Sequence, residues 1–224
     1  MPRRYVPIYT GEIYHIYNRG IDKRPVFLQK REYDRAILTL RYYRHASPSL
    51  RLSIFLTLSL EARELFLERL RLHNPAIVTI LSFCLMPNHY HLLVRQEVDR
   101  GIAQFISKVQ NSYTKYFNTK HKRDGALYSN QFKAVRIESE EQLLHISRYI
   151  HINPYTGFIC KNLHETVMYP WSSLGSYVGN TSFDWIDTSI VLSQFSSKKS
   201  YLRFVDDQKD YQRRLAGIQH LTFE

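Results

Sequence analysis

The stretch "CLMPNHYHLLVRQ", from Cys84 to Gln96, decides the fold because its second half has the pattern of a strand that carries two histidines. Successive side chains on a strand point to opposite faces of the sheet. His89 and His91 therefore share one face, about 7 Å apart along the strand, while the apolar residues between and after them can bury on the other. The mixed apolar run at 77–85 predicts a neighbouring strand, joined to this one by a short turn.

Periodicity and turn signals on both sides of this stretch predict the remaining elements. Strands are expected at 12–20, 77–85, 89–96 and 132–139, and helices at 31–46, 59–73, 101–120, 140–152 and near 200–215. Asn153 and Pro154 are expected to end the helix at 140–152. The order β-α-(α)-β-β-α-β-α predicts an α+β domain, an antiparallel sheet with helices on one face.

Length and composition indicate a single cytoplasmic domain, alone or with an appendage. The chain has 224 residues, and its two cysteines, Cys84 and Cys160, have no spacing that implies a disulfide framework. The first residues lack the apolar segment of a signal peptide. The longest apolar-rich run, 77–86, is about half the length that a membrane span requires.

The net charge of +11 is concentrated in two segments. Residues 1–31 contain seven basic and two acidic side chains, and residues 104–136 contain seven basic side chains and one acidic. The second segment also interleaves aromatic residues with the basic ones, which suits single-stranded nucleic acid because bases stack while phosphates need countercharge. The alternative is a solvated basic surface without a polyanionic partner.

The histidine pair has several interpretations. Two imidazoles on one strand face can bind a metal ion, but they can equally be polar residues on a solvated face or hydrogen-bonded in a core. Zinc held by Cys84 together with His89 and His91 is a further possibility. A histidine-triad phosphoesterase would need a third histidine where Leu93 stands, and the zinc-deaminase pattern is missing.

A second pair of residues could complete such a site from a helix. Tyr149 and Asn153 stand four residues apart in "RYIHINP", so on a helix they share a face about 6 Å apart. The amide oxygen could join the metal ligands while the phenol faces what the metal binds. The plainer alternative is a half-buried aromatic on an amphipathic helix, with Asn153 as its C-terminal cap.

Over about residues 12–177 the chain resembles the single-tyrosine transposases of the His-hydrophobic-His superfamily, most closely the REP-associated tyrosine transposase-like group. The segments that carry the resemblance are "YHIYNRG" (14–20), "CLMPNHYHLLV" (84–94), "SYTKYFNTKHKRDGALYSNQFKAV" (112–135), "LLHISRYIHINPY" (143–155) and "YPWSS" (169–173). The resemblance implies a ferredoxin-like sheet, with His89, His91 and Asn153 as ligands of Mg²⁺ or Mn²⁺ and Tyr149 as the nucleophile. It also implies a transposase domain at 1–177, followed by a C-terminal extension of unknown role at 178–224.

The implied activity is cleavage and rejoining of single-stranded DNA, on hairpin or palindromic sites, through a 5′-phosphotyrosine. The alternatives are a catalytically inactive DNA- or RNA-binding module of the same fold and a zinc-stabilised structural protein. A homodimer is possible and a monomer is equally compatible. Expected contacts to DNA come from basic residues in the two charged segments: Arg19, Lys108, Lys115, Lys120, Lys122, Arg123, Lys133 and Arg136.

Other aromatic residues and histidines are interpreted as structural. Tyr113 and Tyr116 could be mistaken for the nucleophile, but their helical spacing favours packing against the sheet or stacking on a base. His15, His145 and His151 are expected to be structural.

Overall fold

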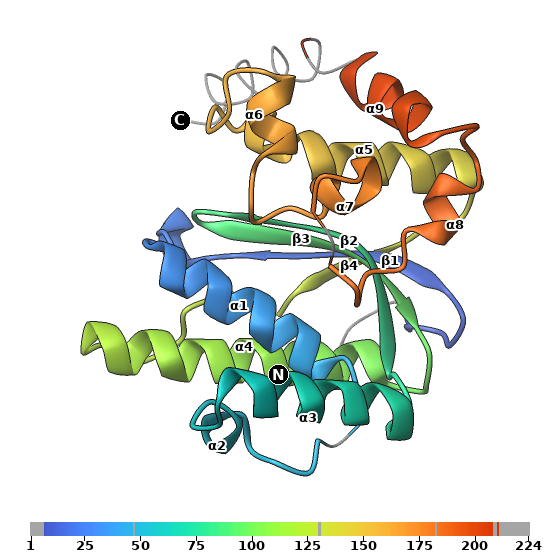
Figure 1. Cartoon of the computed structure of the whole chain (residues 1–224). Helices are drawn as coiled ribbons and strands as arrows, with labels where there is room; N and C mark the ends of the chain where they lie inside the picture. Colours follow the sequence, from blue (N-terminus) through green and yellow to red (C-terminus); the bar gives the residue numbers. More distant parts are fainter. Residues whose placement is uncertain (1–6, 47, 130, 182, 208–209, 211–224) are drawn as a thin grey trace.

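The computed structural model describes residues 7–46, 48–129, 131–181, 183–207 and 210 of the chain (Figure 1). Its centre is a four-stranded antiparallel sheet in the order β2-β3-β1-β4. The strands are β1 (Ile13–Arg19), β2 (Val78–Met86), β3 (His89–Gln96) and β4 (Lys133–Arg136). All four were expected from the sequence, and β3 begins at the first histidine of the pair.

Strand β3 is an inner strand, and its two faces differ as the alternation of its residues predicts. Leu92 and Val94 are fully buried in one core cluster, whereas Leu93 is buried in a second cluster on the opposite face. His91 lies between Tyr17 of β1 and Cys84 of β2 in the register of the sheet. The histidine pair therefore lies on the face of the second cluster.

One face of the sheet is covered by the helices of the two crossover connections, seen below the sheet in Figure 1. These helices are α1 (Lys30–Tyr43) and α4 (Gly101–His121), and they also pack against each other. Between α1 and β2 lie α2 (Leu52–Phe55) and α3 (Leu60–His73). Helix α3 begins where the sequence predicts, because the Ser59 hydroxyl accepts a hydrogen bond from the backbone N–H of Ala62. A short 3₁₀ turn, η1 (Ile21–Lys23), follows β1.

The other face carries the helices that follow β4, seen above the sheet in Figure 1. They are α5 (Glu140–Thr156), α6 (Leu163–Val167), α7 (Leu174–Val178), α8 (Ser189–Leu192) and α9 (Lys198–Asp207). The α+β class with an antiparallel sheet is confirmed, but the helices cover both faces instead of one. The reason is visible in the sheet itself, because its second face is lined by apolar residues such as Leu81 and Leu93 that must be shielded from water.

Helix α5 is longer than the sequence predicts. The expected end at Asn153 and Pro154 is wrong, since α5 continues to Thr156 and Pro154 lies within it. Proline removes one helical hydrogen bond, but the backbone N–H of Gly157 still donates to the Asn153 carbonyl at 2.8 Å, and that of Cys160 donates to the Pro154 carbonyl at 2.9 Å. Asn153 is therefore an interior residue of the helix and not its C-terminal cap.

The segment after residue 178 packs on α5 as far as the structure describes it. Tyr201 and Val205 of α9 are fully buried in the second core cluster. The guanidinium of Arg148 on α5 lies 4.4 Å from the ring centroid of Phe204 on α9. The helix predicted near 200–215 corresponds to α9, and residues 208–209 and 211–215 lie outside the described part. No helix of the described part is long and apolar enough to cross a membrane.

Candidate active site

Four residues singled out in the sequence meet where α5 crosses the sheet. The Nε2 atom of His89 lies 3.1 Å from Oδ1 of Asn153. The rings of His89 and His91 are nearly perpendicular, with centroids 5.0 Å apart. The ring of Tyr149 packs edge-on against His91 at a centroid distance of 5.3 Å. The structure therefore brings both histidines, the tyrosine and the asparagine into one constellation.

Two rigid elements position these side chains. Strand alternation places both histidines on the α5 face of β3, and helical spacing places Tyr149 and Asn153 on the sheet-facing side of α5. Burial differs across the group. Asn153 is only 5% exposed, whereas Tyr149 is 37% exposed. The amide is thus held in the interior while the phenol remains accessible from solvent.

The donor atoms fit a divalent cation. Two imidazole nitrogens and an amide oxygen are ligands that Mn²⁺ and similar cations accept. Two ligand atoms at right angles around an octahedral cation lie about 3.0 Å apart, and His89 Nε2 and Asn153 Oδ1 are 3.1 Å apart. Within the described residues, no group of three or more His, Cys, Asp or Glu side chains could hold a metal ion. The candidate set therefore depends on the amide of Asn153 as its third donor.

The site histidines are biased toward the neutral form that a metal ligand needs. Burial lowers the pKa of His89, the nearby amide oxygen of Asn153 opposes this shift, and the positive charge of Arg19 reinforces it. Burial holds the pKa of His91 well below its usual value, and the neighbouring His89 and His15 lower it further. Protons therefore compete weakly for these nitrogens at neutral pH.

The pKa of Tyr149 is shifted upward, in the opposite direction to the pKa values of the two histidines. Burial raises the pKa of its phenol, hydrogen bonding to Asn153 partly offsets this, and the nearby Tyr17 raises the pKa further. The phenol is therefore protonated at neutral pH, and a nucleophilic Tyr149 would have to lose its proton as substrate binds.

Strand β1 also contributes to this site, which was not expected from the sequence. His15 was interpreted as structural, but its Nε2 atom lies 2.9 Å from Nδ1 of His91. Tyr17 stacks on His15 at 5.0 Å and faces His91 at 5.7 Å between ring centroids. The alternation of His15, Tyr17 and Arg19 on one strand could have placed them on a common face, but the sequence does not show that β1 pairs with β3.

His145 and His151 lie outside the constellation. His151 is fully buried, with Nδ1 at 2.6 Å from the Tyr201 hydroxyl and Nε2 at 2.8 Å from the Ser173 hydroxyl. His145 lies on the exposed side of α5 and contacts Arg148. His151 therefore serves packing between α5 and its neighbours, and neither histidine faces the site, as predicted.

The zinc alternative receives little support from Cys84. This thiol faces the same side as His91 but is fully buried, and burial raises its pKa well above the usual value. Zinc needs the thiolate, which such burial disfavours. The thiol instead hydrogen-bonds to Ser172, in a segment that forms a backbone bridge with β2.

The two tyrosines of α4 are remote from the histidines because α4 lies on the opposite face of the sheet (Figure 1). Tyr113 is buried, and its hydroxyl donates a 2.6 Å hydrogen bond to the Val26 carbonyl. The ring of Tyr116 lies 5.2 Å from the guanidinium of Arg35. Both therefore pack, as predicted, and neither faces the site.

The eight basic residues that were expected to contact DNA do not form one surface. Arg19 lies opposite His89 in the register of β1 and β3, and Lys133 lies opposite Tyr17 across β1 and β4. Both thus lie beside the histidines, on the side of β1 and β4. Arg136 is ion-paired with Glu12 at 2.9 Å, and Lys120 with the buried carboxylate of Glu32 at 2.7 Å, so their charges are already compensated.

The other four basic residues belong to α4 or the turn after it, on the face away from α5: Lys108, Lys115, Lys122 and Arg123. Three of them line an open groove of about 540 Å³ whose walls are Lys115, Asn118, Thr119, Lys122, Arg123 and Asp124.

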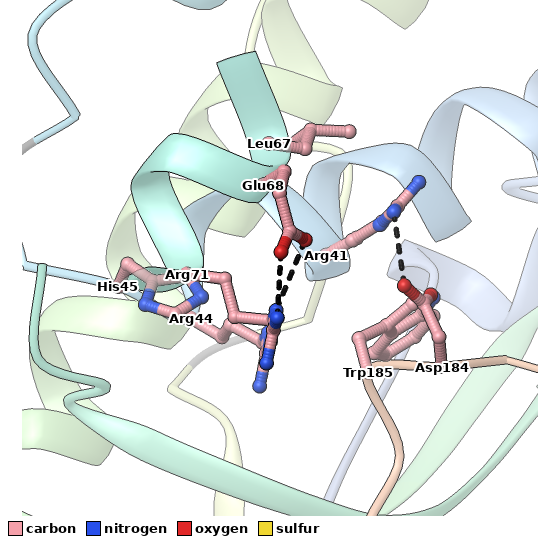
Figure 2. A pocket seen from close by; sticks show the side chains of 8 residues that line it. All are labelled: Arg41, Arg44, His45, Leu67, Glu68, Arg71, Asp184 and Trp185. Carbon is pink, nitrogen blue, oxygen red and sulfur yellow. Dashed lines mark hydrogen bonds and ion pairs between the residues drawn. The ribbon is translucent and has the colours of Figure 1, made fainter. Parts of the chain in front are cut away.

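A further hollow, between α1, α3 and the segment at 184–185, is not a comparable site (Figure 2). Arg41 pairs there with Asp184, and Arg71 pairs with Glu68. Its volume of about 10 Å³ leaves room for little more than a water molecule.

Comparison with known proteins agrees with this constellation. The family model described as "Transposase IS200 like" matches residues 59–153, from the start of α3 to Asn153. This segment is therefore similar to the IS200-like transposases. It contains both histidines, Tyr149 and Asn153, and the family resemblance inferred from the sequence is confirmed.

A solved structure shares the fold. It is described as a REP-associated tyrosine transposase bound to a REP hairpin, and the two chains superpose with a TM-score of 0.52 at 16% sequence identity. The similarity covers 84% of the present chain and 93% of the other. No curated protein sequence matches the chain.

Proposed function

We propose that this transposase is a cation-dependent endonuclease and strand transferase for single-stranded DNA, with Tyr149 as its nucleophile. Two contacts carry the proposal. The ring of Tyr149 lies 5.3 Å from that of His91 between centroids, and Oδ1 of Asn153 lies 3.1 Å from Nε2 of His89. Tyr149 and Asn153 are one helical turn apart on α5. A protein that only binds DNA needs no accessible phenol beside two neutral imidazoles, one buried and the other half-buried.

The chemistry is a transesterification. The phenolic oxygen of Tyr149 forms a bond to a backbone phosphorus, and the bond from that phosphorus to the 3′ oxygen breaks. The phenol proton passes to water, and the departing oxygen takes up a proton to become a free 3′-hydroxyl. The resulting 5′-phosphotyrosine keeps a phosphodiester bond, so attack by another 3′-hydroxyl can rejoin strands without ATP.

His89, His91 and Asn153 would hold a divalent cation, Mg²⁺ or Mn²⁺, whose role when bound is to polarise a non-bridging phosphate oxygen. The side chains themselves perform the remaining tasks. The neutral imidazoles leave lone pairs available, and the buried amide of Asn153 fixes its oxygen in place. Helix α5 keeps the phenol at the edge of this group, open to solvent.

The DNA would cross the site over β1 and β4. Arg19 and Lys133 lie on this side of the histidines and can pair with phosphates of the bound strand. Tyr17 lies between Lys133 and His91 in the register, with the Lys133 ammonium 5.7 Å from its ring centroid, and can stack on a base. The hairpin in the solved structure of similar fold supports a hairpin with a single-stranded flank as the substrate.

The decisive experiment is a search for the covalent adduct. The protein is incubated with Mn²⁺ and labelled DNA hairpins that carry single-stranded flanks drawn from the DNA around its own gene. A band that survives denaturant, followed by mass spectrometry that places the nucleotide on Tyr149, is the expected result. Tight hairpin binding without any adduct in Mn²⁺ or Mg²⁺ would instead identify an inactive binding module.

A further inference from the structure

The two site histidines share a feature that the proposed reaction does not itself require. Each has its Nδ1 atom in contact with a polar side chain from outside the ligand set. Nδ1 of His89 lies 2.6 Å from Oδ1 of Asn88, and Nδ1 of His91 lies 2.9 Å from Nε2 of His15. The Nε2 atoms are therefore the nitrogens that remain for a cation.

The direction of the hydrogen bond at His89 follows from how Asn88 is held. The Nδ2 atom of Asn88 donates to the Lys23 carbonyl at 3.1 Å, and this contact orients the amide so that its oxygen faces His89. Both ring nitrogens of His89 face an amide oxygen, which only accepts: Nδ1 faces Asn88 at 2.6 Å, and Nε2 faces Asn153 at 3.1 Å. A neutral ring has one N–H, and the shorter contact places it on Nδ1. The lone pair of Nε2 and Oδ1 of Asn153 would then share a bound cation.

The hydrogen bond at His91 allows two arrangements, and only one of them permits cation binding. If His15 donated, Nε2 of His91 would carry the proton of the neutral ring and could not bind a cation. If His91 donates from Nδ1, its Nε2 has a free lone pair, and His15 must keep its own proton on Nδ1. The ring of His15 is buried and stacked on Tyr17, which holds it at this position.

We propose that Asn88 and His15 are positioning residues, which hold His89 and His91 in the Nδ1–H tautomer with both Nε2 atoms directed at the cation site. The inference rests on the proposed function for the cation, while the tautomers are a property of the protein without metal or DNA. Side chains of this kind orient metal ligands, and their loss typically weakens metal affinity by about 10–100-fold.

The test measures tautomers first and affinity second. Long-range ¹H–¹⁵N spectra of histidine-labelled protein, recorded without metal near pH 7.5, report which ring nitrogen is protonated. We expect the Nδ1–H form for both His89 and His91. Asn88→Ala and His15→Leu should each shift the histidine that they contact toward the Nε2–H form. Either site histidine in the Nε2–H form in the unchanged protein would overturn the proposal without depending on any variant.

Titration with Mn²⁺, followed by electron paramagnetic resonance without DNA, gives the second measurement. We expect Asn88→Ala and His15→Leu to weaken binding by about 10–100-fold. Asn88→Asp, which keeps an acceptor oxygen, should restore most of it. His45→Leu is the matched control, because His45 is as buried as His15 and hydrogen-bonds through Nδ1 to the Asn74 carbonyl, far from the site.

The two outcomes of the titration are distinct. Affinities of the Asn88→Ala and His15→Leu proteins within twofold of the unchanged protein would overturn the positioning role. Nδ1–H tautomers in an unchanged protein that binds no Mn²⁺ would support the positioning contacts and count against the cation in the proposed function.

Discussion

Replacing single tyrosines by phenylalanine should separate catalysis from stability, because the structure assigns different environments to Tyr149 and Tyr113. The hydroxyl of Tyr113 is buried and donates to the Val26 carbonyl at 2.6 Å. Its removal leaves that carbonyl without a partner, at a cost of about 1–3 kcal/mol. For a chain of this size each kcal/mol lowers Tm by about 2–4 °C, so Tyr113→Phe should lower Tm by about 2–12 °C.

Tyr149→Phe should leave stability almost unchanged and abolish the covalent adduct. The phenol is 37% exposed, so loss of its hydroxyl should change the free energy of unfolding by less than about 0.5 kcal/mol. The covalent DNA adduct should be lost completely. Tyr116→Phe is the neutral control, since the ring that packs near Arg35 is retained.

Thermal unfolding and denaturing gels of DNA adducts, run on the same preparations well below each Tm, measure both properties. The reasoning fails if the adduct persists in Tyr149→Phe and disappears in Tyr113→Phe, which would move the nucleophile to α4. It fails equally if Tyr149→Phe lowers Tm as much as Tyr113→Phe does, because the phenol would then be structural.

Further outcomes follow from the same geometry. His89→Ala and His91→Ala should each abolish cleavage while hairpin affinity is largely retained, as gel-shift titrations would reveal, and excess chelator should reproduce this loss in the unchanged protein. Asn153→Ala should reduce the cleavage rate less than either change, because water can replace one amide oxygen. Competition at fixed salt should favour single-stranded or hairpin DNA over plain duplex, and equal affinity for duplex would contradict the proposed use of stacking. Stability should fall on acidification below pH 6.5, since burial lowers the pKa of His151 from 6.5 to about 3 and the unfolded chain then binds more protons; the loss from this group at pH 5 is about 2 kcal/mol. Chemical denaturation at pH 7.5 and 5 should show that His151→Gln removes this part of the pH dependence.

The sequence was most informative where one element dictates the geometry by itself. Strand alternation placed His89 and His91 on one face, and helical spacing placed Tyr149 above Asn153. Both relations are local, and the structure confirms both. The end of α5 was missed because proline favours a break, whereas backbone hydrogen bonds to the Asn153 and Pro154 carbonyls and packing on β2 and β3 accompany its continuation through Pro154.

Contacts between residues that are far apart in the sequence could not be predicted in the same way. His15 lies 76 positions before His91, and only the pairing of β1 with β3 brings their rings together. The short helices α6, α7 and α8 on the second face of the sheet were not predicted, because the chain after about residue 155 has weak periodicity. Its helix α9 is held by buried contacts such as Tyr201 with Ser147, at 2.7 Å between hydroxyl oxygens.

A single chain supplies every member of the constellation, and this has a kinetic consequence. Only the segment 137–139 separates β4 from α5, and α5 then packs on the same sheet that carries the histidines. An equimolar mixture of Tyr149→Phe and His89→Ala proteins should therefore show no activity, because the intact His89 of one variant and the intact Tyr149 of the other lie in different chains. At saturating DNA, turnover per chain should stay constant on dilution.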